Sequence, residues 1–213
     1  MRKTILRRCW LAGLLLFPVL FGCAAGNHSL GFVEPRLMDA YIPLFQRHSL
    51  ISMRWAAAFT IAPHIAVTND HNLNLIPAER VLARSRDYDL LFFHTDEDTA
   101  PVIASPRRGM QVIAYGQGGE RELREASGVV AIVGDALPAR CEGCAIQRVL
   151  AFDAKAGVGF SGGPVVDAQS GAALGFTFGY LDGKAADGGR RMYAYDIDLV
   201  IAEMHRLLGA APG

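Results

Sequence analysis

After about residue 50 the chain consists of short runs rich in β-branched and aromatic residues, separated by turn-forming residues and by no long helical pattern. About ten strands with no helix between them suit a pair of small antiparallel β-barrels. The predicted strands cover residues 51–62, 65–68, 81–84, 90–95, 111–115, 129–133, 146–152, 164–167, 172–178 and 191–195. The sequence therefore predicts an all-β fold.

A single helix is predicted, at the C-terminal end of the chain. Apolar residues recur at helical spacing at positions 199, 200, 204, 207 and 208, with Asp198 as the expected N-cap and Gly209 as the terminator. His205 lies one residue off this apolar stripe. We therefore expect it at the surface or half-buried, without a catalytic role.

Residues 1–22 differ from the rest of the chain. Four basic residues at positions 2, 3, 7 and 8 precede an apolar run over 9–21, which is typical of a secretory signal peptide and short for a membrane span. The run ends in Leu20-Phe21-Gly22-Cys23, which resembles a bacterial lipoprotein cleavage box. That resemblance implies export, a lipid on Cys23 and, because Ala24 follows, anchoring in the outer membrane facing the periplasm. The alternative is an ordinary secretory signal cut near Ala24 or Ala25.

Composition and charge exclude several classes of function. The 21 Lys and Arg residues balance the 21 Asp and Glu residues, whereas a nucleic-acid-binding protein would favour a basic patch or stripe. The sequence contains no His-Glu-x-x-His, and its histidines show no metal-ligand spacing with acids or cysteines. We expect no nucleic-acid partner, no metal and no cofactor. Residues 23–48 are interpreted as a tether and lead-in, with a short helix over 37–45 that is cut by Pro43.

The stretch Gly159-Phe160-Ser161-Gly162-Gly163-Pro164 indicates a backbone bent to present the Ser161 hydroxyl. A serine nucleophile needs a histidine base that is itself oriented by a carboxylate. His71 ends one apolar run and Asp89 opens another, which gives the order His71, Asp89, Ser161. The nucleophile elbow of α/β-hydrolases requires serine, acid and then histidine, and only His205 follows Ser161. The elbow is therefore excluded, and a plain glycine-rich turn is the remaining alternative.

These stretches resemble the trypsin-like (chymotrypsin-fold) serine proteases, and among them the bacterial Deg/HtrA-type protease domains. The resemblance implies two antiparallel barrels of the six-stranded type, over residues 49–105 and over 106–213 with the C-terminal helix. It also implies a serine endopeptidase acting on polypeptides, with His71 and Asp89 in the first barrel, Ser161 in the second and the site in the cleft between them. A related alternative is an inactive protein of the same fold that acts as a membrane-anchored binding or scaffold module.

The resemblance assigns further roles. The backbone N–H groups of Gly159 and Ser161 would form the oxyanion hole, and Thr177-Phe178-Gly179 would line the substrate cleft with the Thr177 hydroxyl near Asp89. Lys155 falls near the pocket base in relatives.

Three details of the sequence depart from the trypsin pattern or add to it. His71 and Asp89 are only 18 positions apart, so Asp87 is an alternative acid. Phe160 stands where animal trypsins carry the aspartate that pairs with a new amino terminus, and we expect its ring to pack under the Gly159 turn instead. Export implies a disulfide between Cys141 and Cys144.

Overall fold

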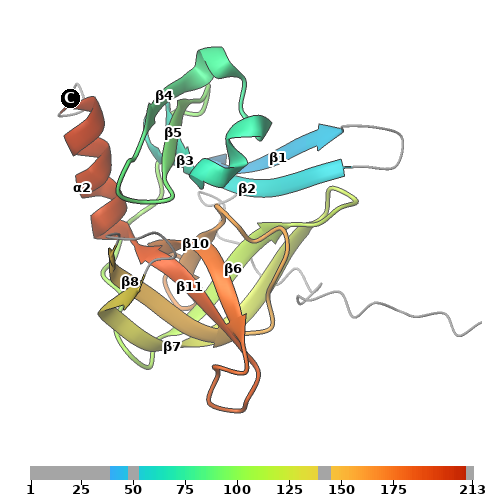
Figure 1. The fold of residues 1–213 in the computed structure, drawn as a ribbon, viewed down its shortest axis with the longest axis vertical. Helices are drawn as coiled ribbons and strands as arrows, with labels where there is room; N and C mark the ends of the chain where they lie inside the picture. Colours follow the sequence, from blue (N-terminus) through green and yellow to red (C-terminus); the bar gives the residue numbers. More distant parts are fainter. Residues whose placement is uncertain (1–38, 48–52, 139–144, 210–213) are drawn as a thin grey trace, which may run out of the picture.

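The first half of the chain forms an antiparallel sheet. The structure is a computed structural model that describes residues 39–47, 53–138 and 145–209. The first sheet has five strands in the order β1-β2-β3-β5-β4, and short 3₁₀ helices lie between β3 and β4 (Figure 1). Its elements are β1 (Tyr41–Arg47), β2 (Met53–Ala62), β3 (Ile65–Thr68), η1 (Asp70–Leu75), η2 (Ala78–Arg80), β4 (Val81–Arg84) and β5 (Leu91–His94).

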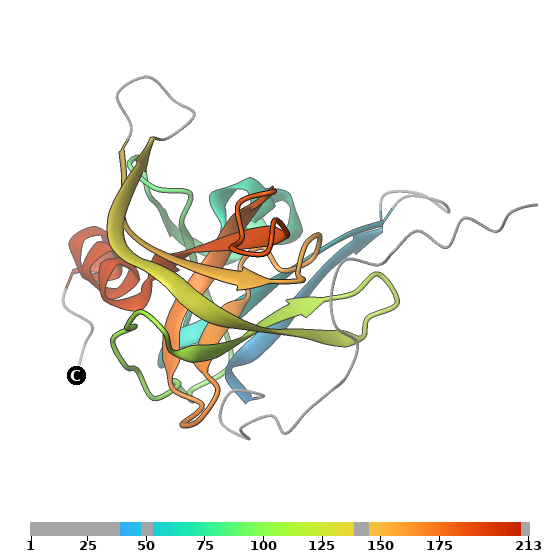
Figure 2. The same ribbon diagram turned by 90° about the horizontal axis from the view of Figure 1, so that it is seen from below.

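The second half closes into a barrel with the strand order β10-β11-β8-β7-β6-β9. The longest strand, β7, bends across one side of the barrel in Figure 2, because its pairing with β8 is interrupted by three register shifts that act as bulges. The strands are β6 (Gln111–Gln117), β7 (Leu123–Pro138), β8 (Ala145–Ala154), β9 (Pro164–Asp167), β10 (Ala173–Asp182) and β11 (Arg190–Asp196). The predicted all-β fold of two antiparallel units and a C-terminal helix is confirmed.

One predicted element is wrong. Residues 41–47 form strand β1 and not the end of a short helix, and β1 pairs with β2 along its whole length. Pro43 stops a helix, but it is tolerated in an edge strand, where its missing N–H has no partner to lose. The first sheet therefore begins at Tyr41, within the predicted tether, and not at residue 49.

The C-terminal helix α2 (Ile197–Leu208) lies at the joint of the two halves, beside β4 in Figure 1. Its N-cap is Asp196, whose side chain accepts from the Asp198 N–H, so the cap lies two residues before the predicted one. Gly209 ends the helix as predicted, and His205 is exposed. Leu199, Val200 and Met204 form the apolar face of α2 and pack with residues of both halves, namely Phe59, Val67, Leu90, Phe92, Phe176 and Tyr195.

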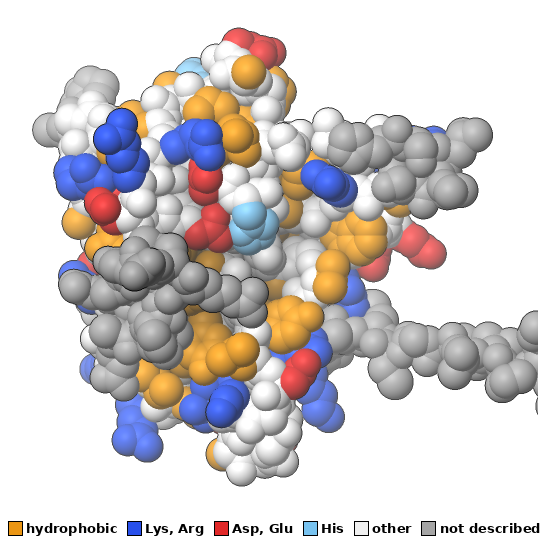
Figure 3. All heavy atoms as spheres, in the orientation of Figure 1, with side chains coloured by type: hydrophobic (Ala, Val, Ile, Leu, Met, Phe, Trp, Pro, Cys, Tyr) orange, Lys and Arg blue, Asp and Glu red, His pale blue; other side chains and the backbone are white. Residues whose placement is uncertain are grey.

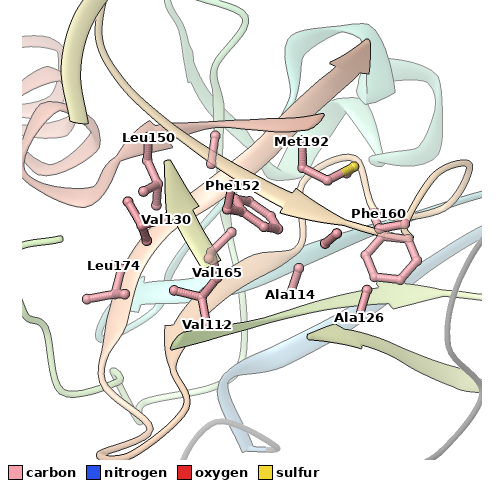
Figure 4. Close-up of a cluster of buried hydrophobic side chains, with 13 residues drawn as sticks. Val112, Ala114, Ala126, Val130, Leu150, Phe152, Phe160, Val165, Leu174 and Met192 are labelled. Carbon is pink, nitrogen blue, oxygen red and sulfur yellow. The ribbon is translucent and has the colours of Figure 1, made fainter. Parts of the chain in front are cut away.

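The core of the barrel reaches the serine segment. Figure 4 shows the ring of Phe160 among side chains of the barrel interior, next to Ala114 and Ala126. Phe160 is fully buried, although it lies in the turn between β8 and β9. The turn that carries Ser161 is thus fixed to the barrel by an apolar contact.

No helix in the described part of the chain is long and apolar enough to cross a membrane. Cys23, Cys141 and Cys144 lie outside the described residues.

Candidate active site

Two hydrogen bonds join His71 to the carboxylate of Asp89, one from its ring and one from its backbone. The Nδ1 atom of His71 lies 2.7 Å from Oδ2 of Asp89, and the His71 backbone N–H donates to Oδ1 at 3.0 Å. Both carboxylate oxygens are therefore used to fix the position and the tautomer of one histidine. The alternative acid, Asp87, points elsewhere, because its carboxylate lies 3.4 Å from Arg206 on α2. Of the two candidates, Asp89 is the one that orients His71.

Buried polar side chains hold His71 at the start of η1. The Asn72 amide donates to the Thr68 hydroxyl at 3.0 Å, and that hydroxyl donates to the Ala57 carbonyl on β2 at 2.8 Å. The Asn69 amide donates to the Asp89 carbonyl at 3.2 Å, which ties the histidine segment to the acid. Sequence reasoning missed these roles of Asn69 and Asn72, because an asparagine in a polar Thr-Asn-Asp-His-Asn run is equally typical of an exposed turn.

The backbone before Ser161 forms a turn that only glycine can complete. The Phe160 N–H donates to the Gly157 carbonyl at 3.2 Å, and Gly159 has φ +92°, which is the geometry of a type II turn. The Gly159 carbonyl accepts from the Gln117 N–H at 2.8 Å, and a Cβ at Gly159 would collide with the Gln117 carbonyl. Within the described residues, the N–H groups of Gly159 and Ser161 donate no hydrogen bond. Both are therefore available to an oxyanion.

The prediction for the Thr177 side chain is wrong. Its hydroxyl lies 2.5 Å from the Phe160 carbonyl and 2.8 Å from the Gly163 carbonyl, and the residue is fully buried. Thr177 therefore holds the serine turn and does not approach Asp89. A hydroxyl that does contact Asp89 belongs to Tyr195, which accepts the Asp89 backbone N–H at 3.0 Å and was not identified from the sequence.

One cleft brings the predicted site residues together. It has a volume of about 990 Å³ and is lined by His71, Asp89, Gly159, Ser161, Phe178 and Gly179, and by the aromatic residues Trp55, Tyr180, Tyr193 and Tyr195. On the face drawn in Figure 3, hydrophobic side chains gather beside a histidine and acidic side chains. Lys155 lies in a separate hollow, with Asp153 and Arg190. Among the described residues, no group of three or more acidic, histidine or cysteine side chains could hold a metal ion.

Ser161 and His71 line the cleft from opposite halves of the molecule. No hydrogen bond joins their side chains in the described part of the chain. Catalytic hydrogen bonds are often long or poorly aligned without substrate and tighten when it binds. The arrangement can therefore support nucleophilic attack by Ser161 once the two side chains approach each other.

Comparison with known proteins finds no matching family model and no matching curated sequence. The solved structures that match include the active form of the Rv3671c protease from M. tuberculosis, with a TM-score of 0.65 and 16% identity over 84% of this chain and 86% of that one. The MamO protease domain from Magnetospirillum magneticum matches with a TM-score of 0.59 and 15% identity over 79% of this chain and 97% of that one.

The HtrA-type protease AlgW with a bound tripeptide also matches, with a TM-score of 0.63 and 17% identity. That match covers 80% of this chain and only 60% of the longer AlgW chain. At such low identities these likenesses show the fold alone. The protein has a chymotrypsin-like protease fold.

Proposed function

We propose that the protein is a serine endopeptidase that uses His71, Asp89 and Ser161. The observation that carries this proposal is the two-point contact of Asp89 with His71, in a cleft that also contains Ser161 and the Gly159 turn. The His71 side chain is half-exposed, so the packing of the fold does not require a carboxylate to bind it with both oxygens. A catalytic triad does require that arrangement. The proteolytic activity named for the structural neighbours adds support.

In the proposed mechanism His71 removes the proton from the Ser161 hydroxyl as its oxygen attacks a peptide carbonyl. Asp89 holds the Nδ1–H of His71 and stabilises the imidazolium that forms. The N–H groups of Gly159 and Ser161 bind the oxyanion of the tetrahedral intermediate, and losing one such donor typically raises the barrier by about 2.7–4 kcal/mol. His71 then gives the proton to the leaving amine, which leaves the acyl group bound to Ser161. A water molecule that His71 deprotonates attacks this ester, and the carboxylic acid product leaves as the proton returns to Ser161.

The second candidate function is that of an inactive scaffold with the same fold. It is favoured by the absence, among the described contacts, of a hydrogen bond between Ser161 and His71. A fluorophosphonate probe separates the two candidates, because it labels only a serine that an adjacent base activates. We expect the wild type to be labelled and Ser161→Ala to remain unlabelled. A folded wild type that neither reacts with the probe nor cleaves an unfolded protein substrate would favour the scaffold.

We further propose that the protein is exported and anchored through a lipid on Cys23, as the sequence Leu20-Phe21-Gly22-Cys23 suggests. Cys23→Ser should abolish lipid incorporation and remove the protein from the membrane fraction. A wild type without lipid by mass spectrometry, or a mutant with unchanged membrane partitioning, would contradict the anchor. In the same exported protein, Cys141 and Cys144 should resist alkylation until a reductant is added.

A further inference from the structure

The candidate acid lies in a short loop and not in a strand. β4 ends at Arg84 and β5 begins at Leu91, so Asp89 has no ladder of strand hydrogen bonds around it. The loop is instead closed on Ser85, whose N–H donates to the Leu90 carbonyl at 2.9 Å. The Ser85 hydroxyl also accepts the N–H groups of Asp87 and Tyr88, both at 3.1 Å. The position of Asp89 therefore depends on where Ser85 is held.

Helix α2 holds Ser85 through a buried carboxylate. The Ser85 hydroxyl donates to Oε1 of Glu203 at 2.5 Å, and Glu203 is only 5% exposed. Arg206, one turn further along α2, donates to both oxygens of Glu203 at 2.5 and 2.6 Å and lies 3.4 Å from Asp87. Hydrogen bonds from Arg206 hold the pKa of Glu203 below its usual range, so the carboxylate stays ionised and accepts from Ser85. Arg206 thus holds the Glu203 carboxylate from within the helix while that carboxylate accepts from Ser85.

A second contact fixes Asp89 from the barrel. The Tyr195 hydroxyl of β11 accepts the Asp89 backbone N–H, and its ring packs 4.4 Å from the ring of Phe178 and edge-on at 5.9 Å to Tyr88. Burial raises the pKa of Tyr195, so its hydroxyl remains neutral. The loop is thus held at Ser85 by α2 and at Asp89 by β11.

We propose that Glu203 is a positioning residue of the active site, which acts through Ser85 to fix the loop that presents Asp89 to His71. The proposal rests on the function proposed above. It makes the C-terminal helix part of the catalytic apparatus, although none of its residues touches the cleft. Because the loop is too short to be supported by a longer hairpin of its own sheet, its rigidity comes from an element 118 positions away in the sequence.

The size of the effect follows from how strongly catalysis depends on placement. A misplacement of about 1 Å in a catalytic group can lower the rate on the order of 100-fold. Ser85→Ala removes the acceptor of two loop N–H groups together with the contact to α2, so we expect a fall in kcat of about 10- to 100-fold with little change in KM. Glu203→Gln keeps an acceptor for Ser85 but weakens the contact with Arg206, and should give a smaller fall. Ser85→Thr keeps the hydroxyl and should restore most of the rate.

The test compares these variants with Asp153→Asn in the full-length protein. Asp153 forms a similar carboxylate–arginine pair, with hydrogen bonds of 2.6 and 3.0 Å from Arg191, but it lies away from the triad. We would measure kcat and KM, the unfolding midpoint and the ¹⁵N chemical shifts of the His71 ring, which report without turnover which nitrogen carries the proton. Asp153→Asn should lower only the stability and leave kcat and the His71 shifts unchanged. Ser85→Ala and Glu203→Gln should lower kcat and also change the His71 shifts.

The outcomes separate this proposal from the proposed function. Unchanged kcat and unchanged His71 shifts in folded Ser85→Ala and Glu203→Gln would overturn the positioning role and leave the peptidase intact. An inactive wild type whose His71 shifts still change in these variants would overturn the peptidase and leave the positioning role intact. If Ser85→Ala does not fold, Glu203→Gln and Ser85→Thr decide by the same two measurements.

Discussion

Truncating Phe160 tests whether apolar burial holds the oxyanion turn. The residue is fully buried in the barrel core, and its backbone joins Gly159 to Ser161. Its ring lies directly on β6, because a Cβ added at Gly116 would come within 2.7 Å of the Phe160 Cγ atom. Removing a buried phenylalanine ring costs about 3–5 kcal/mol of folding free energy. Phe160→Ala should therefore lower the free energy of unfolding by this amount.

The same substitution should also lower the turnover of the molecules that remain folded. Without the ring, the N–H groups of Gly159 and Ser161 lose the contact that keeps their turn against the core. Loss of one oxyanion donor lowers kcat about 10²- to 10³-fold, which sets the upper bound for the effect. Phe160→Leu, which refills part of the space, should be intermediate in both respects and protects the test against a variant that does not fold.

Phe152→Ala is the matched control, because Phe152 is equally buried in the same core but lies on β8. Urea unfolding gives the stability of each variant, and peptide hydrolysis normalised by fluorophosphonate titration gives the turnover per active site. We expect equal losses of stability and a loss of turnover for Phe160→Ala only. Equal turnover of Phe160→Ala and Phe152→Ala would refute the reasoning.

Three further predictions follow from the same contacts. Asp89→Asn should lower kcat about 10⁴-fold, because it leaves His71 in the wrong tautomer. Asp87→Asn, whose partner is Arg206, should lower kcat far less, and the reverse ranking in a kinetic assay would contradict the assignment. Soluble truncated forms of the protein that start anywhere between Ala24 and Leu37 should hydrolyse peptides at similar rates, because the buried ring of Phe160 cannot form an ion pair with a new amino terminus. A hydrolysis rate that depends on one particular first residue would count against this. Hydrogen bonds from Arg191 and Arg206 hold the pKa values of Asp153 and Glu203 below their ordinary values of 3.8 and 4.5. The stability that these two carboxylates contribute is therefore complete above the ordinary pKa values and is lost as the pH falls through the lowered pKa values. Urea unfolding at a series of acidic pH values should show this loss of stability, and the loss should be smaller in Glu203→Gln.

The sequence predicts the strands in which a short apolar run is bounded on both sides by turn-forming residues. Residues 65–68, 81–84 and 164–167 have the predicted bounds, because short β-branched runs between turn residues permit little else. β7 extends far beyond the predicted 129–133. Its added part contains Gly128, Gly134 and the polar residues Arg124, Glu125 and Ser127, which resemble loop sequence and hide the strand from the pattern. Such a strand is specified by pairing with β6 and β8 on both sides, which no local pattern reveals.

The candidate site could be predicted only in part, for two physical reasons. The register of β10 against β11 shifts between Thr177 and Gly179, and a shift of one residue turns a side chain to the other face of a strand. Phe178, the residue skipped in this shift, lines the cleft, whereas Thr177 keeps its pairing with Ala194 and holds the serine turn. The contacts of Asp89 with Tyr195 and, through Ser85, with Glu203 join positions more than 100 apart. Such pairs leave no signal in spacing or periodicity.

The serine segment could be recognised because its glycines are required by tertiary contacts. A side chain at Gly159 would collide with the Gln117 carbonyl of β6, and one at Gly163 with the Tyr115 carbonyl of the same strand. Gly162, at φ +82°, lies against the Ala57 carbonyl of β2. The N–H of Ala57 donates to the Ser161 carbonyl at 3.0 Å. The segment that presents Ser161 is therefore also the joint between the sheet and the barrel. The Ala57 carbonyl also holds Asn72, the neighbour of His71, through the Thr68 hydroxyl, so one residue of β2 contacts both the segment of the base and that of the nucleophile.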